Sequence, residues 1–304
     1  MLSPCDSIWK DNSIRIGDAL ATSYVDRLNA EGLSELAAAA GDAKGEPGGA
    51  GREESDKHFA WRFSNSAGRS VYVSADPEAK LRVVQGAIFD SFTDGEVILA
   101  DVPSGSGAGS LGILSSIYEL RKAGLAATLP IRVKIVAGDF SERAGEHFDA
   151  LFASLQDVFS TQGIYMFLER VHWDANDLGT AAALVDRVVD KAEGADRIFL
   201  LVSNFSDALK DRGLRSKFEH FVSQFTSRVK GRPNSLVWIE PNSGEARELL
   251  PKVDSWVKAV LSWFGIGEKS RVLSVQYEMC DPLTSRVFGT GVVVLRCSAE
   301  GLPW

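Results

Sequence analysis

A glycine-rich segment at 101–109 is the part of the sequence best suited to bind a ligand. It reads Asp-Val-Pro-Ser-Gly-Ser-Gly-Ala-Gly and joins the apolar run EVILADV, at 96–102, to a predicted helix. Glycines let the backbone turn sharply and approach a ligand that a β-carbon would exclude. At the carboxyl end of a parallel strand, such a turn lies in the usual ligand crevice of an open α/β sheet. A G-x-G-x-G turn alone is equally compatible with a merely tight loop, so the residues that follow decide its meaning.

Two further groups of polar residues follow the next predicted strands. Asp139 comes directly after the strand at 131–138, and the sequence His-Trp-Asp-Ala at 172–175 comes after the strand at 165–171. A carboxylate has two acceptor oxygens and no donor, so Asp139 suits a ligand with paired hydroxyls. Its plainer role is to cap the helix that follows. Because the carboxyl ends of parallel strands share one edge of a sheet, we expect these groups to lie close together.

Strands and helices alternate regularly from residue 96 onward. The strands are continuous apolar runs, which is typical of a parallel sheet with helices on both faces. The predicted strands are 96–102, 131–138, 165–171, 197–203 and 235–240, and the predicted helices are 110–123, 141–160, 178–193, 214–230 and 244–264.

The C-terminal part breaks this alternation. Two predicted strands, 271–279 and 286–297, are joined by a short turn around Asp281 with no helix between them, so they must pair antiparallel. An NAD-binding Rossmann domain would continue with a parallel strand instead. The sequence therefore predicts an α/β fold with a doubly wound, mostly parallel sheet and a C-terminal antiparallel β-hairpin, preceded by an N-terminal extension of helix and strand.

These motifs, in this order, resemble the class I (Rossmann-like) S-adenosylmethionine-dependent methyltransferases over about residues 90–297. The pattern D-x-P-x-G-x-G that begins at Asp101 is similar to motif I of that family, D/E-x-G-x-G-x-G, with a proline in place of the first glycine. Residues 136–142 are similar to the family's G-x-D-x-S-x pattern, and residues 172–178 to its G-D-A-x-x-L segment.

The resemblance implies S-adenosylmethionine as the cofactor and methyl transfer as the activity. In the family, the acidic residue at the place of Asp139 accepts hydrogen bonds from both ribose hydroxyls, and the one at the place of Asp174 accepts from the adenine amino group. Trp173 suits either a contact with the adenine ring or packing against the next helix. The cofactor-binding residues that the motifs imply are Asp101, Pro103, Gly105, Gly107, Gly109, Asp139, Phe140, Trp173, Asp174, Ala175, Ser203 and Asn204.

A neutral methyl acceptor also needs a general base. The candidate catalytic residues are Asn204, Asp207 and Glu240, at the carboxyl ends of the fourth and fifth predicted strands of the sheet. Asp207 is equally suited to cap a helix, and Glu240, which precedes Pro241, to end its strand. The tetrapeptide N/D/S-P-P-Y/F of the amino-methylating branch does not occur at 203–206, so amino methylation is not supported.

The N-terminal third divides into a helical segment at 1–40, a flexible linker at 41–56 and a cap at 57–93, which opens the Rossmann-like domain of residues 57–304. Apolar residues between 13 and 40 recur at near-helical spacing. The linker is rich in glycine and charge and has no large apolar side chain, so it cannot bury enough surface to become ordered. The helical segment either closes over the ligand crevice or contacts a protein partner.

Within the cap, the sequence predicts strands at 59–63 and 70–74 and then a helix that Asp76 caps, with Pro77 in its first turn. Aromatic residues of this third suit either an acceptor pocket or a core. They are Trp9, Tyr24, Trp61, Phe63 and Tyr72, to which Phe205 and the loop at 240–244 are added.

Composition is ordinary for a soluble globular protein, with 45% hydrophobic and 24% charged residues. No apolar run approaches the about 20 residues of a membrane span, and no secretory signal is evident, so we expect a cytoplasmic protein without a membrane partner. The net charge of −8 argues weakly against a surface built for nucleic acid, and a basic stretch at 210–232 fits a solvated helix face. The scattered cysteines and histidines have no metal-ligand spacing, so we expect no metal.

The methyl acceptor stays open among small molecules, nucleic acids and proteins. A second hypothesis is a catalytically silent protein that binds S-adenosylmethionine, or a scaffold subunit of a complex. A third is a nucleotide-binding oxidoreductase, which the terminal hairpin disfavours. Binding of S-adenosylmethionine against binding of NAD separates the third hypothesis from the other two.

Overall fold

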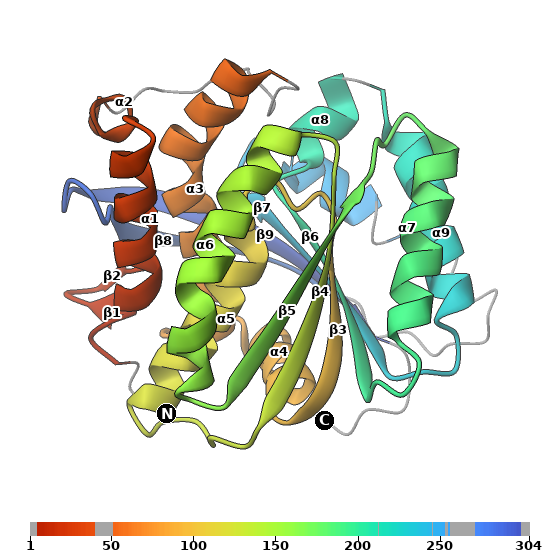
Figure 1. The fold of residues 1–304 in the computed structure, drawn as a ribbon, viewed down its shortest axis with the longest axis horizontal. Coiled ribbons are helices and arrows are strands. Elements are labelled where there is room, and N and C mark those ends of the chain that lie inside the picture. Colours follow the sequence, from red (N-terminus) through yellow and green to blue (C-terminus); the bar gives the residue numbers. More distant parts are fainter. Residues whose placement is uncertain are drawn as a thin grey trace.

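In the part of the chain that the structure describes, nine strands form a central sheet that lies between two layers of helices (Figure 1). The computed structural model describes residues 5–39, 51–211, 213–244, 246–252, 255 and 271–298. The strand order is β1-β2-β8-β9-β7-β6-β3-β4-β5. Each face of the sheet packs against its own hydrophobic cluster.

The five predicted parallel strands are present and lie next to one another in the sheet. They are β3 (Gly95–Asp101), β4 (Ile131–Asp139), β5 (Ile164–His172), β6 (Arg197–Ser203) and β7 (Asn234–Pro241). Val97 and Leu99 of β3 pack into one cluster, while Ile98 and Ala100 pack into the other. Because successive side chains point to opposite faces and both faces are covered, the strand has to be apolar throughout.

The predicted terminal hairpin is also confirmed. Strands β8 (Arg271–Cys280) and β9 (Val287–Ser298) pair antiparallel, and β9 lies between β8 and β7, to which it is antiparallel as well. Beyond β8, the short strands β1 (Trp9–Lys10) and β2 (Ser13–Ile14) complete this edge of the sheet. The N-terminal helix therefore does not begin at residue 13 as predicted.

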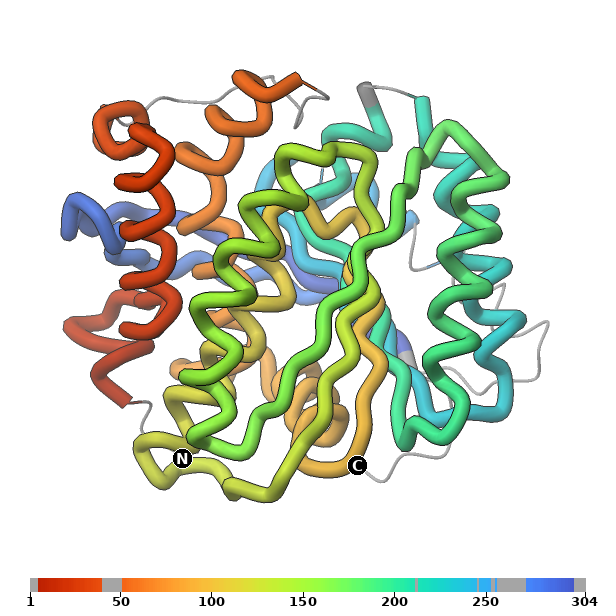
Figure 2. Tube along the Cα trace, viewed as in Figure 1, coloured from red at the N-terminus to blue at the C-terminus, as the bar shows by residue number. Residues whose placement is uncertain are grey.

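Helices cover the two faces unevenly (Figure 2). The helices on one face are α1 (Asp18–Ala30), α2 (Ser34–Ala38), α3 (Arg52–Ala75), α4 (Arg82–Phe92), α5 (Ala108–Lys122) and α6 (Glu142–Ser160). Those on the other face are α7 (Leu178–Lys191), α8 (Ser206–Asp211) and α9 (Arg215–Arg228). The helix predicted at 244–264 lies largely outside the described residues, and α8 had no sequence prediction.

Helix α3 overturns the predicted strands at 59–63 and 70–74, which are both parts of this one helix. It also begins at Arg52, so residues 52–56 are not linker, whereas residues 41–50 lie outside the described part. Aromatic and β-branched residues favour strands locally. Here Phe59 and Phe63 lie one turn apart and are buried in the same cluster, so the gain from burial outweighs the local preference.

Asp76 ends α3 rather than beginning the next helix. Its backbone is left-handed, with φ 42°, and its Oδ1 accepts hydrogen bonds from the backbone N–H groups of Lys80 (2.8 Å) and Leu81 (2.9 Å). The short turn that results delays α4 until Arg82. Asp and Asn tolerate this conformation better than most residues, which is why an acidic residue can close a helix here.

The close approach of α3 to α5 depends on Gly112, because a β-carbon there would lie 2.7 Å from the carbonyl oxygen of Ala67. We expect Gly112→Ala to lower the free energy of unfolding by about 2 kcal/mol, through forced separation of the two helices. Urea denaturation measures this. The matched control is Gly86→Ala in α4, where a β-carbon meets no atom within 4 Å. That change should raise stability by about 0.5–1 kcal/mol, as alanine does inside helices. Equal effects of the two substitutions would contradict the packing argument.

Candidate functional site

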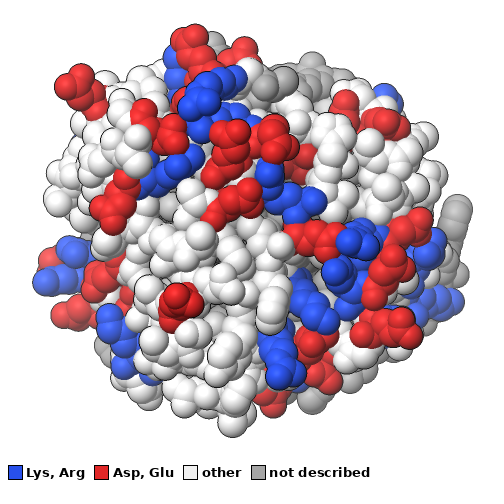
Figure 3. Space-filling view, in the orientation of Figure 1, with Lys and Arg blue, Asp and Glu red and all other residues white. Residues whose placement is uncertain are grey.

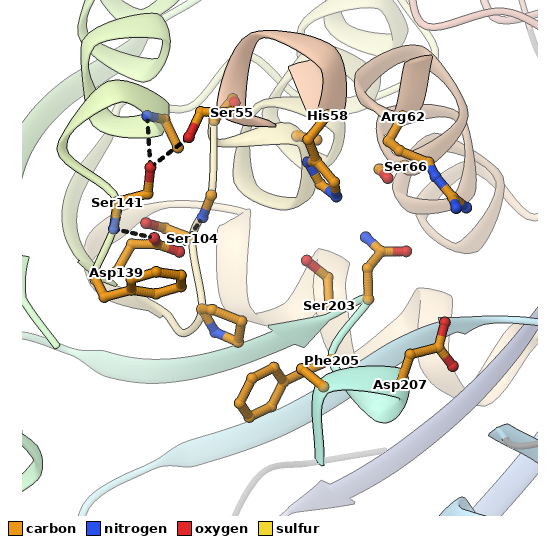
Figure 4. Close-up of a pocket in the computed structure, with 18 of the residues that line it drawn as sticks. Ser55, His58, Arg62, Ser66, Ser104, Asp139, Ser141, Ser203, Phe205 and Asp207 are labelled. Carbon is orange, nitrogen blue, oxygen red and sulfur yellow. Dashed lines mark hydrogen bonds between the residues drawn. The ribbon is translucent and has the colours of Figure 1, made fainter. Parts of the chain in front are cut away.

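A cavity opens at the carboxyl ends of β3, β4 and β6, and α3 forms the wall opposite the sheet (Figure 4). Eleven of the sequence-predicted site residues line it: Pro103, Gly105, Asp139, Phe140, Trp173, Asp174, Ala175, Ser203, Asn204, Asp207 and Glu240. The other three predicted residues, Asp101, Gly107 and Gly109, do not line it. The carboxyl ends of parallel strands thus meet at one place, as the topology requires.

The three glycines of the turn have different tasks. Gly105, with φ 49°, faces the cavity, and a β-carbon there would meet no atom within 4 Å. Gly107, with φ 78°, packs against the ring of Phe148, which a β-carbon would overlap. Gly109 packs against Ser203 and Leu201, the first only 2.9 Å from an added β-carbon. Only Gly105 therefore leaves room for a ligand to approach the backbone.

Asp139 joins two neighbouring strand ends. Its Oδ2 accepts a hydrogen bond from the backbone N–H of Gly105 (2.8 Å), and its Oδ1 accepts from that of Ser141 (2.8 Å). Burial raises the pKa of Asp139, while the N–H groups of Ser141, Gly105 and Phe140 oppose that shift. Each carboxylate oxygen has a second lone pair, so the group can accept further hydrogen bonds from a ligand in the cavity. The plainer role considered for Asp139, capping of the following helix, belongs to Ser141, whose side chain caps α6.

Trp173, which follows the third predicted strand, is part of the core. Trp173 is 2% exposed and packs against Phe205, with ring centroids 5.7 Å apart. It also contributes to the cavity wall, so contact with a ligand and packing are both available to it. Asp174 accepts a hydrogen bond from the backbone N–H of Asn176 on Oδ1 (2.8 Å), which fixes the loop beside the cavity.

The end of β6 has an unusual backbone. Asn204 has φ 54°, in the left-handed region that few residues other than glycine adopt. Its Oδ1 accepts a hydrogen bond from Nε of Arg69 (3.1 Å) and another from Nη2 of the same guanidinium. This contact ties the fourth strand end to α3, on the opposite wall of the cavity.

Of the candidate bases, Glu240 already accepts four hydrogen bonds, three of them on Oε1 and one on Oε2. It is fully buried, and burial raises its pKa. Its oxygens accept from the backbone N–H groups of Phe205 (2.8 Å) and Ser206 (3.1 Å), from the Ser206 hydroxyl (2.9 Å) and from Nε1 of Trp238. We interpret it as the group that holds the start of α8 in place. Asp207 is exposed in the first turn of that helix and faces the cavity.

Sequence reasoning missed the polar residues that α3 contributes, because it assigned strands there. Five polar residues of this helix line the cavity at spacings of three, four, four and three: Ser55, His58, Arg62, Ser66 and Arg69. That spacing follows one face of a helix and was a signal available in the sequence. Burial, together with the positive charges of Arg62 and Arg69, lowers the pKa of His58 to about 4. His58 is therefore a neutral imidazole at physiological pH.

Most of the aromatic residues predicted for an acceptor pocket belong to the core instead. Phe63 and Phe205 line the cavity. Tyr24 donates to the carbonyl oxygen of Ala60 (2.9 Å) inside the core. Trp9, Trp61 and Tyr72 also lie away from the cavity, and the ring of Tyr72 stacks on that of Tyr277 at 4.1 Å between centroids. Aromatic residues upstream of the glycine turn thus serve mainly to pack α3 and the hairpin.

Charges of both signs are interspersed on the face shown in Figure 3. Among the described residues, no group of three or more His, Cys, Asp or Glu side chains is arranged to hold a metal ion. No helix in the described ranges is long and apolar enough to cross a bilayer. Several basic residues of the 210–232 stretch bond to neighbouring groups, as expected of a solvated helix face. The pairs are Arg215 with Glu219, Lys217 with Asn176, Arg228 with Asp186 and Arg232 with Ala192.

The five parallel strands followed by an antiparallel hairpin give this chain the class I methyltransferase-like fold that its motifs predict. No protein-family profile and no curated protein matches the sequence. Among solved structures, precorrin-6y C5,15-methyltransferase from Geobacter metallireducens GS-15 is 11% identical, with a TM-score of 0.40 over 73% of this chain and 88% of that one. Loganic acid methyltransferase with SAH is 10% identical, with a TM-score of 0.34 over 77% and 92%. Similarity this distant assigns neither a reaction nor a substrate to this chain.

Proposed function

We propose that this protein is an S-adenosylmethionine-dependent methyltransferase. The observation that carries the proposal is the contact between Asp139 and the Gly105 backbone N–H at the edge of the cavity. It brings an acceptor carboxylate and an open glycine turn together at the tips of adjacent parallel strands. A nucleoside with two ribose hydroxyls matches such a carboxylate, and the space beside Gly105 lets an extended chain lie against the backbone.

The residues present fit the cofactor along the length of the cavity. We expect Asp139 to accept from the ribose hydroxyls, with Trp173, Asp174 and Ala175 beside the adenine. Ser203 and Asn204 then lie next to the reacting methyl group, which the bound cofactor supplies on a sulfonium. Displacement at such a carbon depends mainly on alignment and on exclusion of water. Buried lining residues such as Phe63, Trp173 and Phe205 support the exclusion of water from this part of the cavity.

Calorimetric titration with S-adenosylmethionine, S-adenosylhomocysteine and NAD tests the cofactor. We expect saturable binding of the first two and none of NAD. Labelled methyl transfer into a cell extract, separated into RNA, DNA, protein and metabolites, then tests the activity and identifies the class of acceptor. Binding without transfer to any fraction would favour a silent subunit of a complex over an enzyme.

Asp139→Ala is expected to weaken binding of S-adenosylhomocysteine by about 1–3 kcal/mol, because the ribose hydroxyls lose a charged acceptor. The dissociation constant measured by calorimetry reports the change, and urea denaturation shows whether the variant is folded. Asp157→Ala, an exposed position on α6, is the matched control and should bind as the wild type does. Gly107→Val is unsuitable as a probe of binding, because its side chain would overlap Phe148 and disturb folding. Unchanged affinity in folded Asp139→Ala would contradict the assigned pocket.

A further inference from the structure

A buried guanidinium without a carboxylate partner lies in the wall of the cavity. Arg69 is 4% exposed and lines the cavity from α3. Within the described residues it forms no ion pair, and its hydrogen-bond partners are the neutral groups Asn204 and Ser66. Burial lowers the pKa of Arg69, and the positive charge of Arg62 adds to that effect. A guanidinium stays charged in proteins, so burial without an ion-pair partner is costly.

The hydrogen bonds of Arg69 determine what its neighbours offer to a ligand. The Oδ1 of Asn204 accepts two hydrogen bonds from Arg69, so only the NH₂ group of this amide is left for the cavity. The Oγ of Ser66 accepts from Nη2 of Arg69 (3.2 Å), which leaves the hydroxyl hydrogen to be donated. No described residue accepts from Nη1 of Arg69. All three groups can therefore donate, and they suit a ligand oxygen rather than an amino group.

Acidic residues near Arg69 do not satisfy this charge directly. Glu240 and Asp207 attract it electrostatically, but neither is paired with it. The oxygens of Glu240 are held by Phe205, Ser206 and Trp238. The guanidinium therefore keeps a donor nitrogen that an anion in the cavity can reach.

We propose that Arg69, Asn204 and Ser66 form the subsite that binds a carboxylate of the methyl acceptor, an inference that rests on the proposed function. The carboxylate is an anchor rather than the methylated group, because hydrogen bonds from a guanidinium make its oxygens poorer nucleophiles. In Figure 4, Ser66, Arg62 and Asp207 lie on the side of the cavity away from Asp139. The subsite is thus separate from the carboxylate expected to hold the ribose, as a second substrate requires.

Two binding measurements on the purified full chain test this subsite. In the first, benzoate, acetate and inorganic phosphate are titrated into protein saturated with S-adenosylhomocysteine, with neutral benzamide as the uncharged comparison. We expect benzoate to bind and benzamide not to bind. Arg69→Met should lower the affinity for benzoate at least about tenfold. Ser66→Ala, which keeps the contact of Arg69 with Asn204, should lower it about threefold. Lys57→Met is the matched control, because it removes a positive charge from α3 outside the cavity.

The second measurement separates an acceptor carboxylate from the carboxylate of the cofactor itself. S-adenosylhomocysteine and 5′-methylthioadenosine, which lacks the amino-acid part, are titrated into wild type and Arg69→Met. We expect wild type and Arg69→Met to bind S-adenosylhomocysteine with the same affinity as each other, and likewise 5′-methylthioadenosine. Weaker binding of S-adenosylhomocysteine alone would show that Arg69 holds the cofactor, and would overturn the acceptor subsite.

Failures of the two proposals give different results. If wild type binds no S-adenosylhomocysteine, the proposed function is wrong, whatever benzoate does. If it binds S-adenosylhomocysteine but no anion, or binds benzamide as tightly as benzoate, only the carboxylate subsite is wrong. Should Arg69→Met not fold, Ser66→Ala decides the matter, and an unchanged affinity for benzoate in that variant overturns the subsite.

Discussion

Asp101→Asn is expected to remove a loss of stability that the wild-type protein suffers between mildly acidic and mildly alkaline pH. Asp101 is fully buried at the end of β3, and neither of its carboxylate oxygens has a hydrogen-bond partner among the described residues. Burial raises its pKa from the ordinary 3.8 to about 8. The nearby hydroxyl and backbone N–H of Ser110, which lie outside good hydrogen-bond geometry, oppose this shift only in part, and the charge of Asp139 adds to it. The protonated form is therefore the one that the folded protein accommodates.

The direction of the pH effect follows from this raised pKa. Below about pH 4 both the folded and the unfolded chain carry a protonated Asp101, and no stability is lost. As pH rises toward 8, the unfolded chain releases the proton while the folded chain keeps it, so the free energy of unfolding falls. The loss reaches about 6 kcal/mol and is complete once the folded carboxyl ionises, above about pH 8. Asparagine does not titrate, so the variant lacks this contribution.

Urea denaturation of wild type and Asp101→Asn from about pH 5 to about pH 9 gives the free energy of unfolding at each pH, and the slope of that free energy against pH is compared between the two proteins. A buried amide changes the stability by an amount that does not depend on pH, so the slope is the diagnostic quantity. Asp190→Asn, at an exposed position on α7, is the matched control and should keep the wild-type slope. Parallel curves for wild type and Asp101→Asn would refute the assignment.

For Glu240, we expect substitution by leucine to lower the free energy of unfolding far more than substitution by glutamine. Leucine leaves the backbone N–H groups of Phe205 and Ser206 and the indole N–H of Trp238 buried without acceptors. The expected cost is about 3 kcal/mol in the free energy of unfolding, since each unpaired buried donor is costly. Glutamine keeps the oxygen that those three donors share, and its NH₂ group can donate to the Ser206 hydroxyl. Glu240→Gln should therefore stay within about 1 kcal/mol of the wild type.

This pair of variants also decides between the two roles of Glu240. A carboxylate that acts as general base cannot be replaced by an amide, whereas one that only accepts hydrogen bonds can. Loss of methyl transfer in Glu240→Gln with unchanged stability would establish Glu240 as the base. Equal destabilisation by leucine and glutamine would contradict the hydrogen-bond pattern. Glu248→Gln, at an exposed position, controls for the loss of a surface charge.

The predicted site was assembled from strand ends, and the structure adds a second wall from α3. His58, Arg62, Ser66 and Arg69 face the residues that follow β6 across the cavity. No strand end carries an arginine into the cavity, so its positive charge comes entirely from this helix, within the described residues. The motifs that resemble the family therefore do not include the residues that give the cavity its positive charge.

The N-terminal helix α1 packs against the core in the structure, a role that the sequence analysis did not assign to it. Leu20 and Tyr24 of α1 are buried in the same cluster as α3 and α6. An ionic network around Arg143, which pairs with Glu31 and Asp56, fixes the ends of these helices to one another. Whether the outer surface of α1 also contacts a protein partner stays a prediction, as does a cytoplasmic location.

Sequence alone determined the five parallel strands and the terminal hairpin, because a strand covered on both faces has to be apolar throughout and a short link forces strands to pair antiparallel. It also placed Gly105 and Asp139, since turns after parallel strands converge at one edge. Tertiary structure decided α3, where burial against α5 and α6 outweighs the strand preference of its aromatic and β-branched residues. It also decided that Glu240 is enclosed by donors and that Arg69 faces the cavity. Such pairings join residues more than 30 positions apart, and local pattern carries no information about contacts of that range.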